Sequence, residues 1–290
     1  MAAVHHRYAT VRGQELFYRE AGPADAPVIV LLHGFPTSSF MFRNLIPELA
    51  ARYHVIAPDH LGFGLSAAPP AGEFDYTFDA LTELTAGLLG QLGVERYAIY
   101  VQDYGAPIGW RLALADPGAV TAIVTQNGNG YEAGFIEDFW KTVWEYQRER
   151  NPVTEANIRG ALSRESIRWQ YLTGEPEQSL VSPDTWNHDF ALVSRPGNDA
   201  VQLALFRDYA SNPPLYPALH EYLRTTRPPV LAVWGRNDPI FAPEGARAFA
   251  EDVPDAEIHL LDGGHFVLES AGDEIASLVL GFLDRISIRN

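Results

Sequence analysis

The feature that most constrains the fold is an alternation of short apolar runs with segments of helical periodicity. Residues 28–32 (VIVLL) form a continuous run of β-branched residues and leucine, the pattern of a strand buried on both faces of a sheet. Similar runs predict strands at residues 53–57, 96–101, 119–125, 229–234 and 256–261, and periodicity predicts helices at 39–51, 78–92, 105–115 and about 268–283. Strands and helices in this order predict a mostly parallel sheet with helices on both faces.

Residues 131–225 interrupt this alternation. They are rich in aromatic and charged residues, and stretches such as FIEDFWKTVWEYQRER carry helical periodicity without a strand pattern. The segment could be a separate downstream domain. Because the strand pattern returns at residue 229, we instead predict a helical cap at 131–225, inserted into a core formed by residues 1–130 and 226–290.

Composition narrows the class of protein. The 21 basic and 37 acidic residues give a net charge of −16, which disfavours nucleic acid and anionic membranes as partners. The chain has no cysteine, which excludes disulfides and thiol catalysis, and none of its nine histidines has metal-ligand spacing. We therefore expect no metal and no cofactor. No early apolar run is long enough to span a bilayer, so we expect a cytoplasmic protein.

Residues 101–110 read VQDYGAPIGW and join an expected strand to an expected helix. A turn of this kind can present one side chain, here Asp103, at its tip, and needs a small residue such as Gly105 two positions later for close packing. Val101 stands where a second glycine is usual in such turns. The simpler alternative is that Asp103 only caps the following helix.

Two more segments place chemically active side chains directly after strands. Asp238 follows one strand in WGRNDPIF, and His265 lies in a glycine-flanked loop in LLDGGHFVLES. The carboxyl ends of parallel strands meet along one edge of a sheet, so Asp103, Asp238 and His265 are expected to converge in one crevice. The order nucleophile, acid, histidine is that of a hydrolase triad.

With these motifs and HGFPTSSFMFRNLIPELAARYHVIAPDHLGFGLS at residues 33–66, the chain resembles the α/β-hydrolase superfamily over nearly its whole length. An aspartate at position 103 resembles the branch of epoxide hydrolases and haloalkane dehalogenases. The resemblance implies an α/β-hydrolase fold and a covalent alkyl ester on Asp103. It further implies that His265, oriented by Asp238, activates water to hydrolyse this ester.

The resemblance also places an oxyanion hole at the backbone N–H groups of Phe35 and Tyr104. Haloalkane dehalogenases carry side-chain N–H donors for the halide at these two positions, whereas phenylalanine has no donor and tyrosine has a hydroxyl. Epoxide hydrolases instead use two cap tyrosines as proton donors. The segment LFRDYASN resembles the one that carries the second of these, which indicates Tyr209.

For the other cap tyrosine we expect Tyr146, with Tyr131 and Tyr171 as rivals. The favoured function is thus an epoxide hydrolase that uses water to open a small or medium neutral epoxide. One alternative is a haloalkane dehalogenase with the same triad, in which Trp140 or Trp144 would supply an indole donor. The other alternative is a catalytically idle scaffold that binds an apolar ligand beneath the cap. A fluoroacetate-type dehalogenase is disfavoured, because its two carboxylate-binding arginines are absent.

Overall fold

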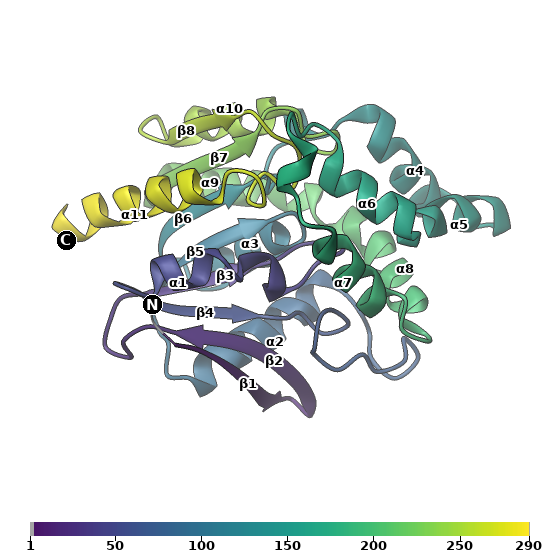
Figure 1. Cartoon of the computed structure of the whole chain (residues 1–290), viewed down its shortest axis with the longest axis horizontal. Coiled ribbons are helices and arrows are strands. Elements are labelled where there is room, and N and C mark those ends of the chain that lie inside the picture. The colour runs from purple at the N-terminus through teal and green to yellow at the C-terminus, as the bar shows by residue number, and fades with distance from the viewer. Residues whose placement is uncertain (1–2, 290) are drawn as a thin grey trace.

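The computed structural model describes residues 3–289 and has one eight-stranded sheet with helices packed against both faces (Figure 1). The strands are β1 (Val4–Val11), β2 (Gln14–Ala21), β3 (Val28–Leu32), β4 (His54–Pro58), β5 (Tyr97–Gln102), β6 (Val120–Gln126), β7 (Val230–Gly235) and β8 (Glu257–Leu261), in the spatial order β1-β2-β4-β3-β5-β6-β7-β8. The pairs β1–β2 and β2–β4 are antiparallel, and all other pairs are parallel. The expected α/β class is confirmed.

Side chains of the central strands alternate between two apolar clusters, one on each face of the sheet. On one face lie α2 (Phe78–Gln91), α3 (Gly105–Ala115), α9 (Tyr216–Thr226) and α10 (Pro243–Asp252), and on the other lie α1 (Leu45–Leu49) and α11 (Gly272–Arg289). The expected helix at 39–51 is divided into a 3-10 turn, Ser39–Phe42, and α1. Pro47 explains the division, because proline has no N–H and is tolerated only in the first turn of a helix.

Five helices follow β6 and gather at one end of the sheet, at the right of Figure 1. They are α4 (Glu137–Arg148), α5 (Pro152–Arg159), α6 (Arg164–Leu172), α7 (Pro183–Val193) and α8 (Asn198–Asp208), here called the α4–α8 segment. Local sequence sets their starts: Asn151 caps α5 with Pro152 in its first turn, and Ser163 caps α6. Helix α9, which falls within the expected cap at residues 131–225, packs against α3 and α10.

A buried arginine joins α3 to the chain that leaves α8. The guanidinium of Arg111 donates to the side chains of Asn212 and Ser211 and to that of Asp79. Nearby, the backbone N–H of Phe78 donates to the carboxylate of Asp208. These contacts fix the end of the α4–α8 segment to the two helices α2 and α3.

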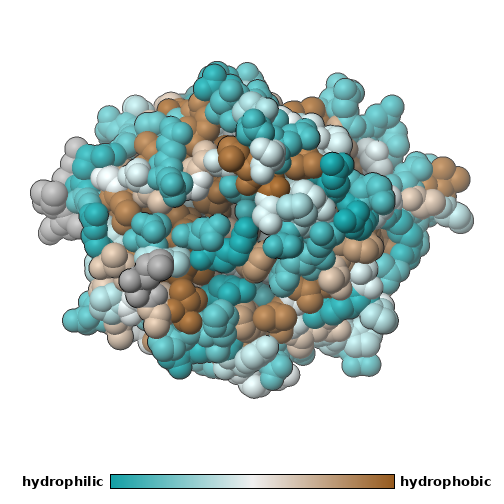
Figure 2. All heavy atoms as spheres, in the orientation of Figure 1, coloured by the Kyte–Doolittle hydropathy of each residue, from teal (hydrophilic) through white to brown (hydrophobic). Residues whose placement is uncertain are grey.

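The face of the molecule seen in Figure 2 is mostly polar, with apolar residues in small separate groups, as the net charge of −16 would favour. Within residues 3–289, no helix has the length and apolarity needed to cross a membrane.

Candidate active site

Asp103 lies at the tip of the turn between β5 and α3, with a backbone φ of +46° in the left-handed region. The helix packs so closely on β3 that a Cβ on Gly105 would lie 2.0 Å from the carbonyl oxygen of Leu32, so only glycine fits there. The side chain of Val101 fits because residue 109 is a glycine: a Cβ on Gly109 would lie 2.6 Å from Cγ1 of Val101. The turn is therefore a tight, strained elbow that holds the aspartate side chain at the N-terminus of the helix.

Backbone donors surround the carboxylate of Asp103. The N–H of Phe35 donates to its Oδ1 at 2.7 Å, and the N–H of Tyr104 also bonds the carboxylate. Burial raises the pKa of Asp103 more than the nearby His265 and these two N–H groups lower it, so that the resulting pKa is about 6. The carboxylate is thus mostly ionised at neutral pH although it is buried.

His265 and Asp238 complete a cluster with Asp103. The His265 ring is fully buried, its Nδ1 lies 2.8 Å from Oδ2 of Asp238, and its Nε2 lies 4.0 Å from Oδ2 of Asp103. Burial lowers the pKa of His265, but the charge and hydrogen bond of Asp238 raise it more, so the net pKa is above its ordinary value. The structure therefore brings together the three side chains expected to form a triad.

Two buried side chains that the sequence analysis did not identify hold this cluster. Asn127, in a left-handed turn directly after β6, donates from Nδ2 to Oδ2 of Asp238 at 2.7 Å and accepts from the N–H of Gly235. Gln102, the last residue of β5, has its Nε2 2.9 Å from Nε2 of His265. The sequence carried a partial signal for Gln102 alone, because β5 is buried throughout and ends in this amide side chain, although the pattern does not show what the amide contacts.

The two expected tyrosines have different surroundings. Tyr209 is buried, its ring centroid lies 5.8 Å from that of Tyr104 and 4.5 Å from that of Trp140, and its hydroxyl is hydrogen-bonded with Tyr216. Burial raises the pKa of Tyr209, and the charges of Tyr216 and Asp103 raise it further. The neighbouring charges that affect the pKa of Tyr146 are those of Glu155 and of three arginines, Arg150, Arg159 and Arg207. Asp103 is thus among the charges that act on Tyr209, whereas the charges that act on Tyr146 are those of Glu155 and these three arginines.

The rival donors are engaged elsewhere. The hydroxyl of Tyr131 donates to Asp252 at 2.7 Å, and that of Tyr171 donates to Asp189 at 2.5 Å. The indole N–H of Trp140 donates to the carbonyl of Ile240 at 3.0 Å, which removes it as a free halide donor. The hydroxyl of Tyr104, by contrast, is buried without a partner among the described residues.

A group of aromatic side chains packs around Tyr104, which directly follows Asp103, and around Tyr209. The rings that pack together there are those of Phe35, Phe78, Tyr104, Phe135, Trp140, Trp144, Phe206, Tyr209 and Phe241. An apolar hollow of about 480 Å³ lies against α4, α5 and α6, and Phe206 is part of its wall. The ring of Phe206 lies 5.0 Å from that of Phe35, so this one side chain borders both the hollow and the site. Such a lining suits a neutral, mostly apolar molecule.

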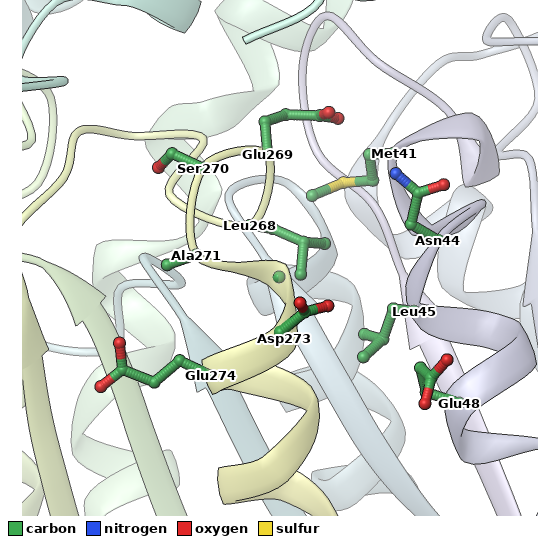
Figure 3. Close-up of a pocket in the computed structure, with 11 residues that line it drawn as sticks. Met41, Asn44, Leu45, Glu48, Leu268, Glu269, Ser270, Ala271, Asp273 and Glu274 are labelled. Atoms are coloured by element: carbon green, nitrogen blue, oxygen red, sulfur yellow. The ribbon is translucent and has the colours of Figure 1, made fainter. Parts of the chain in front are cut away.

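Figure 3 shows a different hollow, of about 440 Å³, between α1 and the start of α11. Its carboxylates, Glu48, Glu269, Asp273 and Glu274, stand apart around the hollow rather than converging on one point. Within the described part of the chain, no group of three or more histidine and carboxylate side chains is placed to hold a metal ion.

Comparison with known proteins settles the family. A family model described as the alpha/beta hydrolase fold matches residues 27–271. The chain belongs to the α/β-hydrolase family. It is 44% identical over 278 residues to an uncharacterized hydrolase, YNR064C, of Saccharomyces cerevisiae, covering 95% of each chain. It is 30% identical over 276 residues to a haloalkane dehalogenase of Mycobacterium marinum, covering 92% of this chain and 88% of that one.

Two further similarities are to an epoxide hydrolase and to a haloalkane dehalogenase, the two branches that the sequence resembles. The chain is 40% identical over 124 residues to epoxide hydrolase A of Mycobacterium tuberculosis, which covers 42% of this chain and 38% of that one. The crystal structure of haloalkane dehalogenase DbeA from Bradyrhizobium elkani superposes with a TM-score of 0.83, at 25% identity and full coverage of both chains. This α/β-hydrolase thus stands close to haloalkane dehalogenases and epoxide hydrolases, as the resemblance implied.

Proposed function

We propose that this α/β-hydrolase opens a small or medium neutral epoxide through a covalent ester on Asp103. The observation that carries the proposal is the placement of Asp103 between two backbone donors and a histidine. Its Oδ1 accepts from the N–H of Phe35, while its Oδ2 faces His265. Oδ2 is thus the attacking atom, and Oδ1 becomes the ester carbonyl oxygen that remains in the oxyanion hole.

The steps follow from these positions. Oδ2 of Asp103 forms a bond to an epoxide carbon, the ring C–O bond breaks, and the alkoxide takes a proton from the hydroxyl of Tyr209. His265 Nε2 then removes a proton from water, whose oxygen adds to the ester carbon. The negative charge passes to Oδ1, held by the N–H groups of Phe35 and Tyr104. Collapse breaks the bond between the ester carbon and Oδ2 and releases a diol, because the proton on His265 passes to the departing oxygen. The proton left on the regenerated Asp103 carboxyl returns to the Tyr209 phenolate, which restores the starting state.

The hydrogen-bond donors near Asp103 favour an alkoxide over a halide as the leaving group. Phe35 provides no side-chain donor, and the indole of Trp140 is already bonded to Ile240, so a departing halide would lack the N–H pair that stabilises it. An alkoxide needs a proton instead. Tyr209, whose hydroxyl is linked to that of Tyr216, lies within electrostatic reach of Asp103 and can supply one. Tyr216 thus replaces Tyr146 as the second tyrosine of the proposal.

Haloalkane dehalogenation is the second candidate. The relative from Mycobacterium marinum, named for that reaction, matches 92% of this chain, and Trp144 stacks on Trp140 with its ring 6.2 Å from that of Tyr209. Under either reaction the α4–α8 segment would serve as the cap that excludes water, the substrate would be a neutral organic molecule, and no cofactor would be needed. Cytoplasmic location remains a prediction.

A His265→Gln variant tests the proposal, because it should form the ester without hydrolysing it. The variant is incubated with styrene oxide or with 1-bromobutane, and intact and peptide masses are measured, with Asp103→Asn/His265→Gln as the control that cannot be alkylated. A styrene oxide adduct on the peptide containing Asp103 supports epoxide chemistry, whereas a butyl adduct there supports dehalogenation. If neither these compounds nor a wider panel label Asp103, the nucleophile assignment is wrong or the protein only binds its ligand.

A further inference from the structure

We propose that Gln102 holds the hydrolytic water during cleavage of the ester, and that until the ester has formed its amide stays hydrogen-bonded to Nε2 of His265, the proposed base. The inference rests on the proposed function and adds one catalytic residue to it. Gln102 immediately precedes the nucleophile, is fully buried at the end of β5, and lies between Asp103 and His265.

The first observation concerns the amide nitrogen of Gln102. The Nδ1 atom of His265 faces Oδ2 of Asp238 at 2.8 Å and carries its proton there, so Nε2 presents a lone pair. The Nε2 of Gln102 lies 2.9 Å from that lone pair and donates to it. In the free protein, therefore, the atom that must accept a proton from water is already hydrogen-bonded to Gln102.

The second observation concerns the amide oxygen. Oε1 of Gln102 is buried and has no hydrogen-bond partner among the described residues, an arrangement that native proteins generally avoid. A Cβ on Gly34 would lie 2.6 Å from this oxygen and 2.6 Å from Oδ1 of Asp103. The unpartnered acceptor thus borders the small space between the nucleophile and the loop that carries the oxyanion donor.

A half-turn of the terminal amide connects the two observations. Rotation about the last side-chain bond of glutamine is a soft, two-fold motion, so nitrogen and oxygen can exchange places without moving the rest of the side chain. The oxygen of Gln102 then faces Nε2 of His265. Because two acceptors repel at 2.9 Å, they move apart far enough for a water between them to donate one hydrogen to each, which leaves its lone pairs free to attack the ester carbon. In the attack its O–H bond breaks toward Nε2, while Gln102 only exchanges hydrogen bonds.

Gln126 provides a matched control for loss of a buried amide. It ends the neighbouring strand, β6, and is also fully buried. Its Nε2 donates to the backbone oxygen of His265 at 3.1 Å, and its Oε1 accepts from the hydroxyl of Tyr100 at 3.1 Å. It therefore supports the histidine loop without approaching the ring nitrogen that acts on water.

The test separates ester formation from ester hydrolysis. Gln102→Met and Gln126→Met are mixed with the compound that labels His265→Gln, quenched at intervals, and analysed by intact mass. Because a positioned base contributes about 10²- to 10⁴-fold, we expect Gln102→Met to hydrolyse the ester about 10- to 100-fold more slowly while forming it at a similar rate. The ester should accumulate, with kcat and KM lowered together and kcat/KM little changed.

Gln102→Glu keeps an acceptor for the water and should recover part of the hydrolysis rate, which a space-filling role would not predict. If Gln102→Met does not fold, Gln102→Asn can replace it, because its amide is withdrawn by one methylene. This variant should also slow ester hydrolysis while leaving the rate of ester formation similar. The inference is overturned if the Gln102 variants hydrolyse the ester at the normal rate, or if both steps slow equally as in Gln126→Met. Absence of any adduct in His265→Gln would instead overturn the proposed function.

Discussion

Replacement of the proposed nucleophile by asparagine should stabilise the fold while abolishing turnover. Burial raises the pKa of Asp103 from 3.8 to about 6, so the folded protein binds this proton more tightly than the unfolded chain does. The cost of the ionised carboxylate is absent below about pH 4, grows as the pH rises toward 6, and is complete near pH 7. A difference of roughly two pKa units corresponds to about 3 kcal/mol.

Asp103→Asn cannot ionise and retains an oxygen that can accept from Phe35. Asparagine also tolerates the left-handed backbone at this position. We therefore expect the unfolding free energies of variant and parent, measured in urea at pH 4, 5, 6 and 7, to diverge with rising pH, up to about 3 kcal/mol in favour of the variant. A difference that does not depend on pH, or a variant less stable at pH 7, would refute the reasoning. In the parent, ester formation should slow about tenfold from pH 7 to pH 5 as Asp103 takes up its proton.

Four other substitutions test separate parts of the molecule. Tyr209→Phe should slow ester formation from an epoxide by about 100-fold, whereas Tyr146→Phe should change it less than about threefold, as measured by single-turnover mass analysis. Burial raises the pKa of Asp189 to about 8, so Asp189→Asn should be more stable than the parent. The difference in unfolding free energy, measured in urea, should keep growing between pH 6 and 8, a higher pH range than for Asp103. Phe206→Ala should join the neighbouring hollow to the site and raise kcat/KM for bulky substrates over small ones; equal changes for both would contradict this placement.

The sequence predicted the six strands from β3 to β8 because most of them are buried on both faces and are therefore apolar without interruption. It did not reveal the hairpin of β1 and β2. Strand β1, VHHRYATV, lies at the edge of the sheet and is largely exposed, so its side chains carry no apolar pattern.

The positions of Asp103, Asp238 and His265 could be predicted for a related reason: each directly follows a strand, and the sheet fixes where strands end. Periodicity could not decide between Tyr146 and its rivals, because it does not determine how α4 is rotated against the core. The contributions of Asn127 and Gln102 depend on contacts between residues far apart in the sequence, 111 and 163 positions respectively. No local pattern encodes such contacts.

The hydrogen bonds of Arg111 limit which parts of the structure can move when the site opens. Its buried guanidinium is bonded on several sides, to Asn212 and Ser211 beyond α8 and to Asp79 at the start of α2. Separating α3 from the residues that follow α8 would leave the charge of Arg111 buried without its partners, which is among the costliest changes a fold can undergo. Helix α3, which carries this arginine, also begins at the elbow of Asp103. We therefore expect the junction at Arg111 to hold Asp103 in place, and we expect any movement that admits a ligand to occur where α4, α5 and α6 line the hollow bordered by Phe206.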